Sequence, residues 1–193
     1  MDDRLGEIIR ASPTLMRVLV IARELGFPDW RVVSGSIYQS VWNALTGRDP
    51  DYGIRDYDLF YFDGRDLSWD AEDLEIRGAA ALFPADLSAK IEVRNQARVH
   101  LWFADHFGEA YAPLSSTDEA IARFVATANA VGVRLEPDGR LDIAAPFGLE
   151  DLFAMRLTPN PGRPLAKGWT QVIASNQARW PEVTVEMAPP ARP

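Results

Sequence analysis

The chain contains no cysteine among its 193 residues, and it has only two histidines. The absence of cysteine excludes disulfide bonds, thiol catalysis, cysteine zinc sites and iron–sulfur clusters. His100 and His106 are too few for a histidine-rich metal centre. Any bound metal would therefore be held mainly by oxygen atoms, which favours magnesium, manganese or calcium.

Long apolar runs and an excess of basic residues are also missing. No stretch of eighteen apolar residues occurs, which predicts no transmembrane helix, and residues 1–4 lack the apolar core of a signal peptide. We therefore expect a cytoplasmic protein with no membrane partner. The net charge is -8, whereas proteins that grip long nucleic acid usually carry a basic face. This balance disfavours long nucleic acid and favours a small-molecule or protein acceptor.

The length and composition fit one globular domain. The chain is 47% hydrophobic and 25% charged, which is ordinary for such a domain. We place the domain at residues 1–181. The remaining residues, 182–193, end in a proline-rich segment and are expected to form a disordered tail.

Hydrophobic periodicity predicts helices and strands in a mixed order. We expect helices over residues 5–10, 13–25, 37–45, 118–130, 148–156 and 165–179. We expect strands over 30–33, 56–62 and 90–99, with the last extended through Trp102 and Phe103, and a hairpin of 133–135 with 140–143. Residues 48–55 are predicted to form a loop. The polar stretch that follows Gly64 is predicted to be partly helical.

Asp56 and Asp58 lie in the clearest strand. Side chains alternate across a strand, so both carboxylates point to one face, with Cα atoms roughly 7 Å apart. Such a pair can flank metal ions that sit about 3.5–4 Å apart in phosphoryl-transfer sites. The pair alone also occurs in solvated loops. Here it opens an apolar strand, where two like charges are costly unless water or a cation compensates them. The core-facing side of the strand would carry Tyr57, Leu59 and Tyr61.

Gly35 and Ser36 stand where a predicted strand ends and a helix begins. Glycine permits close approach to the backbone, and a helix N-terminus offers free N–H groups to a phosphate. The Ser36 hydroxyl would add a donor. The alternative is an ordinary turn in which Ser36 is the N-cap.

Glu92 lies between two apolar residues of the third predicted strand. Ile91 and Val93 face the core, so Lys90, Glu92 and Arg94 share the other face. This face is either the exposed polar side of an edge strand or the place where a third carboxylate closes a metal site.

The order of these features is more specific than any of them alone. A strand, Gly-Ser, a helix, Asp-x-Asp on a strand and an acid on a later strand resemble the DNA polymerase beta-type nucleotidyltransferase superfamily, and more narrowly a bacterial branch of nucleotidyltransferase-like proteins. The resemblance rests on SGSIYQ at 34–39, RDYDL at 55–59, KIEVR at 90–94 and APFGLEDLF at 145–153. It implies an α+β fold with a mixed sheet, in which 32–33, 57–62 and 91–93 are neighbouring strands and helices pack mainly on one face.

The resemblance also implies roles for the site residues. Gly35 and Ser36 would hold a nucleoside triphosphate, Asp56 and Asp58 would bind two magnesium or manganese ions, and Glu92 would complete the metal site. The implied reaction moves a nucleoside monophosphate from the triphosphate to an acceptor hydroxyl. The segment between Ser36 and Asp56 is longer than is usual in the superfamily, because of the loop at 48–55.

Cations and aromatic side chains supply further candidates. Lys90, Arg94 and Lys167, the last on the same predicted helix as Arg179, are candidate phosphate ligands, although such side chains are often only solvated. Three aromatic side chains could stack on a base, but core packing is the favoured interpretation of each: Tyr38, Trp42 and Trp169.

Three other functions compete with nucleotidyl transfer. A glycosyltransferase could use Asp56 and Asp58 with a nucleotide-sugar, but it leaves Gly35, Ser36 and Glu92 without a role. A non-catalytic relative would bind a nucleotide or a protein partner, and the intact acids argue against it. A haloacid-dehalogenase-type phosphatase would need Thr or Val soon after the second aspartate, where leucine and phenylalanine follow instead.

Overall fold

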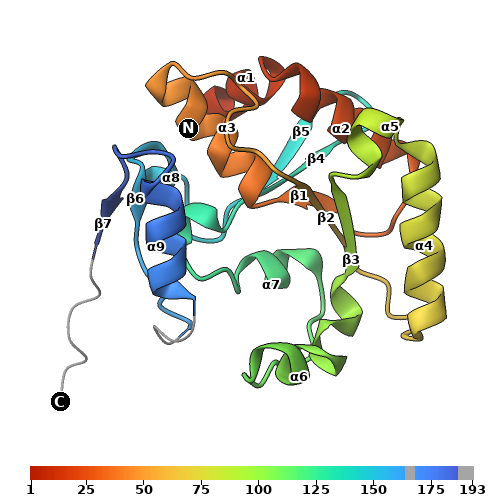
Figure 1. The fold of residues 1–193 in the computed structure, drawn as a ribbon. Helices are drawn as coiled ribbons and strands as arrows, with labels where there is room; N and C mark the ends of the chain where they lie inside the picture. The colour runs from red at the N-terminus through yellow and green to blue at the C-terminus, as the bar shows by residue number, and fades with distance from the viewer. Residues whose placement is uncertain (164–167, 187–193) are drawn as a thin grey trace.

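A computed structural model describes residues 1–163 and 168–186 of the chain (Figure 1). It begins with helices α1 (Asp2–Arg10) and α2 (Pro13–Glu24). Ser12 is the N-cap of α2 and Pro13 its first residue, as predicted, because proline at this position loses no helical hydrogen bond. Within the described ranges, no helix has the length and apolar character needed to cross a membrane.

A five-stranded mixed sheet forms the centre of the protein, and it confirms the α+β fold class. Its strands, in chain order, are β1 (Arg31–Val33), β2 (Tyr57–Tyr61), β3 (Ile91–Asn95), β4 (Gly132–Leu135) and β5 (Leu141–Ala144). Their spatial order is β3-β2-β1-β4-β5. Only β2 and β3 run parallel, and the other neighbours are antiparallel. The three strands expected to be neighbours are therefore adjacent, and the predicted hairpin is β4–β5.

The two faces of the sheet are covered differently. Helices α1, α2 and α3 (Gly35–Thr46) lie over one face (Figure 1), where Val32 joins the main hydrophobic core. Val33 points to the opposite face, as alternation requires, and packs with Ile121 of the short helix α7 (Thr117–Ile121). Helices thus pack mainly on one face, and α7 contributes to a smaller cluster on the other.

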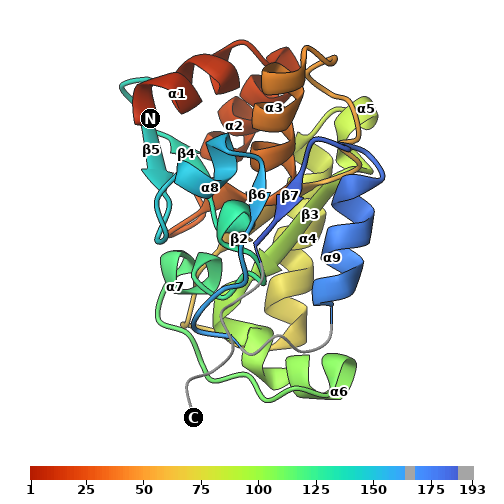
Figure 2. The same ribbon diagram turned by 90° about the vertical axis from the view of Figure 1, so that its left-hand side faces the viewer.

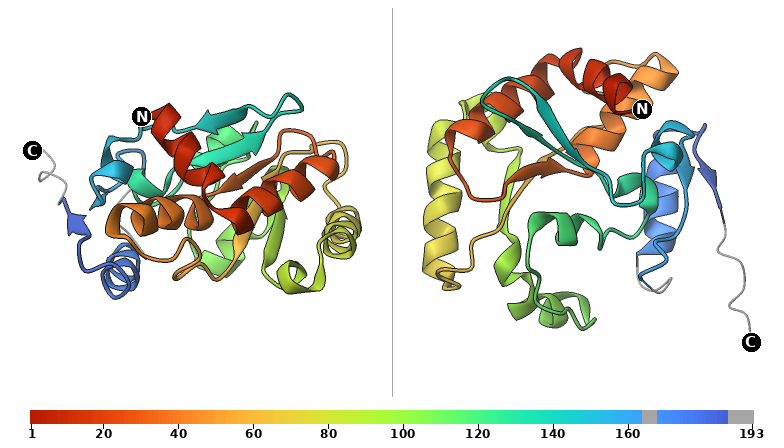
Figure 3. Two further views of the ribbon diagram at one scale, coloured as in Figure 1. Left: turned by 90° about the horizontal axis from the view of Figure 1, so that it is seen from above. Right: turned by 180° about the vertical axis from the view of Figure 1, so that it is seen from behind.

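The polar segment between β2 and β3 forms a longer helix than expected. Helix α4 (Trp69–Leu82) begins at the N-cap Ser68, whose hydroxyl accepts from the Ala71 amide, and α5 (Ala85–Ser88) follows it. Parallel strands need a crossover connection, and these helices supply it. Helix α4 packs beside β3, on the opposite side of the molecule from α9 (Trp169–Gln177) (Figures 1 and 3).

The predicted strand over 90–99, with its extension to Trp102 and Phe103, is wrong beyond Asn95. The Asn95 side chain accepts from the Ala97 amide and turns the chain into a 3-10 helix, Gln96–Leu101. Helix α6 (Phe103–Phe107) follows it. A local side-chain hydrogen bond of this kind competes with the strand ladder.

The helix predicted over 118–130 ends at Ile121. The Asn160 amide donates to the carbonyl groups of Ala122 and Phe124, which a continuing helix would have needed as acceptors. The chain then forms a bridge between Ala126 and Pro159 and a short 3-10 turn, Thr127–Asn129. A distant side chain therefore ends this helix.

The C-terminal part also differs from expectation (Figure 2). The helix predicted over 148–156 is only α8 (Glu150–Phe153), because the backbone turns at Met155, which has a φ of 50°, into β6 (Arg156–Leu157). We expected the ordered chain to end at residue 181, whereas β7 (Thr184–Val185) pairs with β6. Of the helix predicted over 165–179, the first three residues, including Lys167, lie outside the described residues.

The long loop at 48–55 is held in place by hydrogen bonds and by packing. The Asn43 amide donates to the carbonyl groups of Pro50 and Tyr52, and its oxygen accepts from the indole of Trp180. Gly53 lies under Trp180, where a Cβ atom would come within 3.0 Å of the ring. The added loop is thus held against α3 and the C-terminal segment, and Asp56, which was predicted to begin the strand, lies just before β2.

Candidate active site

The register of β2 and β3 brings two acids together. Asp58 pairs with Glu92 across the parallel ladder, and Asp58 also lies opposite Val33 of β1. The strand alternates between buried and partly buried residues, so the Asp58 side chain points away from the main core. Asp58 and Glu92 therefore share one face of the sheet on adjacent strands.

Asp58 is electrostatically coupled to the other predicted acids. The pKa of its carboxyl is raised to about 7, mainly by burial and in addition by the negative charges of Asp56 and Glu92, while Arg94 opposes them. Like charges near a partly buried carboxyl disfavour its ionised form. The carboxylates thus lie close enough to influence one another, with one cation beside them.

Asp56 connects these acids to the Gly-Ser turn. It immediately precedes β2, and a Cβ atom built on Gly35 would lie 4.0 Å from the Asp56 Oδ1 atom and 3.4 Å from the Gln39 Nε2 atom. The antiparallel pairing of β1 and β2 explains this approach, because the residues after Val33 lie beside those before Asp58. The turn and the aspartate pair therefore meet at one end of the site.

The turn itself has two unusual features. Ser34, not Ser36, is the N-cap of α3, and it has a φ of 48°, which is uncommon and strained for a residue other than glycine. Ser36 is 1% exposed, and its hydroxyl has no hydrogen-bond partner. The interpretation of Ser36 as a cap is therefore wrong, and its buried hydroxyl has no structural task within the described protein.

Within the described residues, the first two backbone amides of α3 have no hydrogen-bond acceptor. The amides of Ile37 and Tyr38 both donate to the Ser34 carbonyl. The preceding amides, of Gly35 and Ser36, come before the first helical acceptor and are directed to the open end of the helix. Together with the dipole of a twelve-residue helix, they form a place suited to an anion.

The candidate phosphate ligands differ in position. Arg94 lies in the site: it is partly exposed, and its Nη2 atom is 3.9 Å from Glu92 Oε2. Lys90 is exposed just before β3, where its carbonyl accepts from the Tyr57 amide. Arg179 is bonded elsewhere, since its Nη1 atom donates to Gln39 and to the Gly53 carbonyl. Lys167 lies outside the described residues.

The three acidic side chains are of the type that binds a hard cation. Asp56, Asp58 and Glu92 offer only carboxylate oxygens, which magnesium and manganese prefer. In the part of the chain that the structure describes, no three His, Cys, Asp or Glu side chains converge to hold one metal ion. The acids are thus chemically suitable neighbours rather than a closed cage.

A cavity of about 690 Å³ opens over Asp58 and Glu92. Cavities of this size hold nucleotide-sized ligands. Its far wall comes from α4, the 3-10 helix and α6, which contribute Trp69, Glu72, Ile76, Arg98, Trp102, His106 and Phe107. A buried ion pair between Glu72 and Arg98 holds this wall together, and Glu72 also accepts from the Asn95 amide at the end of β3.

This wall was missed in the sequence. The sequence predicts Trp102 in an extension of the third strand. It predicts no functional role for the polar stretch after Gly64, which contains Glu72. Helix α4 carries four acidic residues within seven positions, so no local pattern marks Glu72 as the one with a buried partner. Nothing in the sequence showed that this partner would be Arg98, 26 residues away. The favoured interpretation of the aromatic side chains as core residues is confirmed, because Tyr38, Trp42 and Trp169 are at most 7% exposed and belong to the core.

Two solved structures are similar to this chain in fold. A solved NMR structure described as revealing a CCA-adding enzyme head domain is 24% identical, with a TM-score of 0.77 and 95% of both chains covered. A CCA-adding enzyme in complex with ATP is 15% identical, with a TM-score of 0.57; the match covers 95% of this chain but 42% of that one. No protein in the curated set matches.

The likeness to these structures shows the fold. The assignment to a family comes from a family model described as "Nucleotidyltransferase", which matches residues 20–185. This range contains the Gly-Ser turn and all three acids. The chain therefore belongs to the nucleotidyltransferase family.

Proposed function

We propose that the protein is a metal-dependent nucleotidyltransferase that moves a nucleoside monophosphate from a nucleoside triphosphate to an acceptor hydroxyl. The observation that carries this proposal is the meeting of three separate segments: Asp58 pairs with Glu92, and Asp56 lies against Gly35. In the reaction, the hydroxyl oxygen bonds to the α-phosphorus and the bond to pyrophosphate breaks. The hydroxyl proton passes to a carboxylate, and pyrophosphate leaves.

The triphosphate fits the start of α3. The amides of Gly35 and Ser36 and the unpartnered Ser36 hydroxyl would donate to its phosphate oxygens. Glycine at position 35 keeps the backbone accessible between Gln39 and Asp56. The similar CCA-adding enzyme in complex with ATP supports a triphosphate as the ligand.

Asp56, Asp58 and Glu92 would hold magnesium or manganese. A divalent cation bound here supplies positive charge that neutralises the phosphates during attack. Burial and, in addition, the charges of Asp56 and Glu92 raise the pKa of Asp58, so a bound cation would favour its ionised form. Glu92 is half exposed and faces the open cavity, so it is placed to accept the proton of an incoming hydroxyl. Arg94 beside it would contact a phosphate.

The rival functions explain less of this arrangement. A glycosyltransferase would use the aspartates but leave the unpartnered Ser36 hydroxyl and the register of Glu92 without a purpose. A non-catalytic relative would bind the triphosphate but needs no proton acceptor.

The test is label transfer. Purified protein is incubated with magnesium, cell extract and each of four nucleoside triphosphates labelled at the α-phosphate, in parallel with labelled sugar nucleotides. We expect the wild-type protein to transfer label from at least one triphosphate to a component of the extract. The Asp58→Asn variant should transfer none. Transfer from a sugar nucleotide alone would favour the glycosyltransferase. Tight triphosphate binding with no turnover in any extract would favour the non-catalytic relative.

A further inference from the structure

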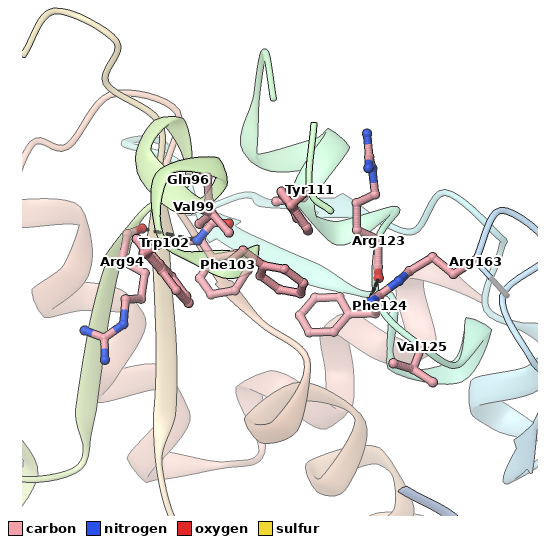
Figure 4. Close-up of a pocket in the computed structure, with 12 residues that line it drawn as sticks. Arg94, Gln96, Val99, Trp102, Phe103, Tyr111, Arg123, Phe124, Val125 and Arg163 are labelled. Carbon is pink, nitrogen blue, oxygen red and sulfur yellow. Dashed lines mark hydrogen bonds between the residues drawn. The ribbon is translucent and has the colours of Figure 1, made fainter. Parts of the chain in front are cut away.

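A second, smaller cavity adjoins the site along the strands (Figure 4). It has a volume of about 180 Å³ and shares Arg94 and Trp102 with the larger cavity. Its remaining lining comes from β2, the 3-10 helix, α6, α7, the loops after α6 and α7, and the segment after β6 that carries Arg163.

The position of this pocket follows from strand register. Phe60 and Arg94 pair across β2 and β3, two residues beyond Asp58 and Glu92 on the same face. Gly35 lies at the opposite end, because β1 runs antiparallel to β2 and leads toward Asp56. Along the strands the order is therefore the phosphate turn, then the acids, then the small pocket.

This order matches the geometry of phosphoryl transfer. The attacking oxygen and the leaving oxygen lie on opposite sides of the phosphorus, roughly in line. If pyrophosphate leaves on the Gly35 side, the attacking hydroxyl must approach from the Phe60 side. That is the side on which the small pocket opens.

The lining indicates the chemistry of the ligand. The rings of Phe60 and Phe124 stack 6.1 Å apart, and the guanidinium groups of Arg123 and Arg163 lie over the rings of Tyr111 and Phe103. Figure 4 shows the side chains of Trp102, Phe103, Phe124 and Arg163 around one space, whereas the guanidinium groups of Arg94 and Arg123 point away from the rings of Phe103 and Phe124. The volume is close to that of an apolar cavity known to bind benzene, roughly 150 Å³, so one planar ring fits.

The charge of the pocket lining indicates a second property of the ligand. The described lining contains three arginines and no acid. Arg123 donates from one Nη atom to Glu119, and Arg163 donates to Glu109 and to the Arg123 carbonyl. A guanidinium has five N–H donors, so both retain donors for a ligand. Arginine recognises carboxylate and phosphate groups through such donors.

We propose that this pocket binds the acceptor, and that the acceptor is a compound with a planar ring and an anionic group whose hydroxyl is presented toward Glu92. This inference rests on the proposed function for its direction of attack. The pocket's preference for a ring with negative charge rests on its lining alone, so the two can be tested separately.

The experiment measures binding of a probe, 4-hydroxybenzoate, by NMR. Ligand saturation transfer reports binding, and the indole N–H signal of Trp102, assigned with Trp102→Phe, reports its place. Benzyl alcohol, which has the ring but no charge, is the matched ligand control. Ala120→Leu fills the pocket from α7, and Arg123→Gln removes one guanidinium. Arg77→Gln is the matched control, because Arg77 also pairs with an acid four residues earlier but lies outside the pocket.

We expect the probe to shift the Trp102 signal and benzyl alcohol to bind at least tenfold more weakly. Ala120→Leu should abolish probe binding, Arg123→Gln should weaken it about tenfold, and Arg77→Gln should leave it unchanged. No binding by the wild-type protein at millimolar concentration, or equal binding by Ala120→Leu, would overturn the proposal.

Calorimetry with a non-hydrolysable triphosphate and magnesium separates a failure of the acceptor pocket from a failure of the proposed function. Unchanged triphosphate affinity in folded Ala120→Leu and Arg123→Gln supports an acceptor pocket. Loss of that affinity in both variants would show that the pocket holds the ring of the nucleotide, which overturns the proposal. Absence of triphosphate binding by the wild-type protein would defeat the proposed function and, with it, the acceptor role, while the probe result would still describe the pocket.

Discussion

The two faces of β2 differ in their exposure to solvent and in what they contact. Tyr57, Leu59 and Tyr61 are 2%, 0% and 2% exposed and belong to the main core. Asp58 and Phe60, between them in sequence, are only partly buried and line the two cavities. One strand therefore supplies stability on one face and the proposed chemistry on the other. Because the period of a strand is two residues, single substitutions at neighbouring positions can separate these contributions.

The largest effect that tests this comparison should come from Asp58→Asn. We expect nucleotidyl transfer to fall at least about a thousandfold, on the order of 4 kcal/mol, because a proposed metal ligand loses its charge. Stability should not fall, since the substitution removes a carboxylate whose pKa is raised by burial and by its acidic neighbours. Transfer rates and thermal unfolding check both parts. Retained activity would remove Asp58 from the chemistry.

The next effect should come from the opposite face. Leu59→Ala deletes a fully buried side chain, and the cavity it leaves should lower the free energy of unfolding by about 3 kcal/mol. Activity per folded molecule should be close to that of the wild-type protein. Urea unfolding, together with assays well below the melting temperature, measures the two. A loss of activity larger than the unfolded fraction explains would show that the faces are not separable.

Metal binding should act on the polar face alone. At magnesium about 100-fold above its dissociation constant, the folded state should gain about 2.7 kcal/mol, seen as a rise of several degrees in the melting temperature. The double variant Asp56→Asn, Asp58→Asn should show no rise, whereas Leu59→Ala should show the full rise from a lower starting point. The same rise in the double variant would place the metal elsewhere.

The smallest effect should come from Ser36→Ala. The hydroxyl has no partner in the protein, so its removal should leave the free energy of unfolding within about 0.5 kcal/mol. Triphosphate binding should weaken by about 1–2 kcal/mol, as expected when a charged ligand loses a donor. Calorimetry with a non-hydrolysable triphosphate measures this. Ser40→Ala is a control, because its hydroxyl already donates to the Ser36 carbonyl.

Much of the first half of the fold was predictable because its signals are local. Pro13 after Ser12, the β-branched strand before Gly35 and the alternation around Asp58 each depend on a few adjacent residues. Two of the predictions failed where contacts between distant residues intervene. Asn160 ends α7 across 36 residues or more, and β7 is held by pairing with β6. Such contacts leave no periodic pattern in the sequence.

The candidate site divides in the same way. By itself, the sequence determined the kind of donor, since a chain without cysteine and with two histidines can offer a metal mainly oxygen, and it determined which residues of each strand share a face. Only the tertiary structure decided that Asp58 pairs with Glu92, that Asp56 meets Gly35, and that arginines at 94, 123 and 163 surround one pocket. The physical reason is that strand register and helix docking are set by the burial of whole faces, which joins residues far apart in the chain.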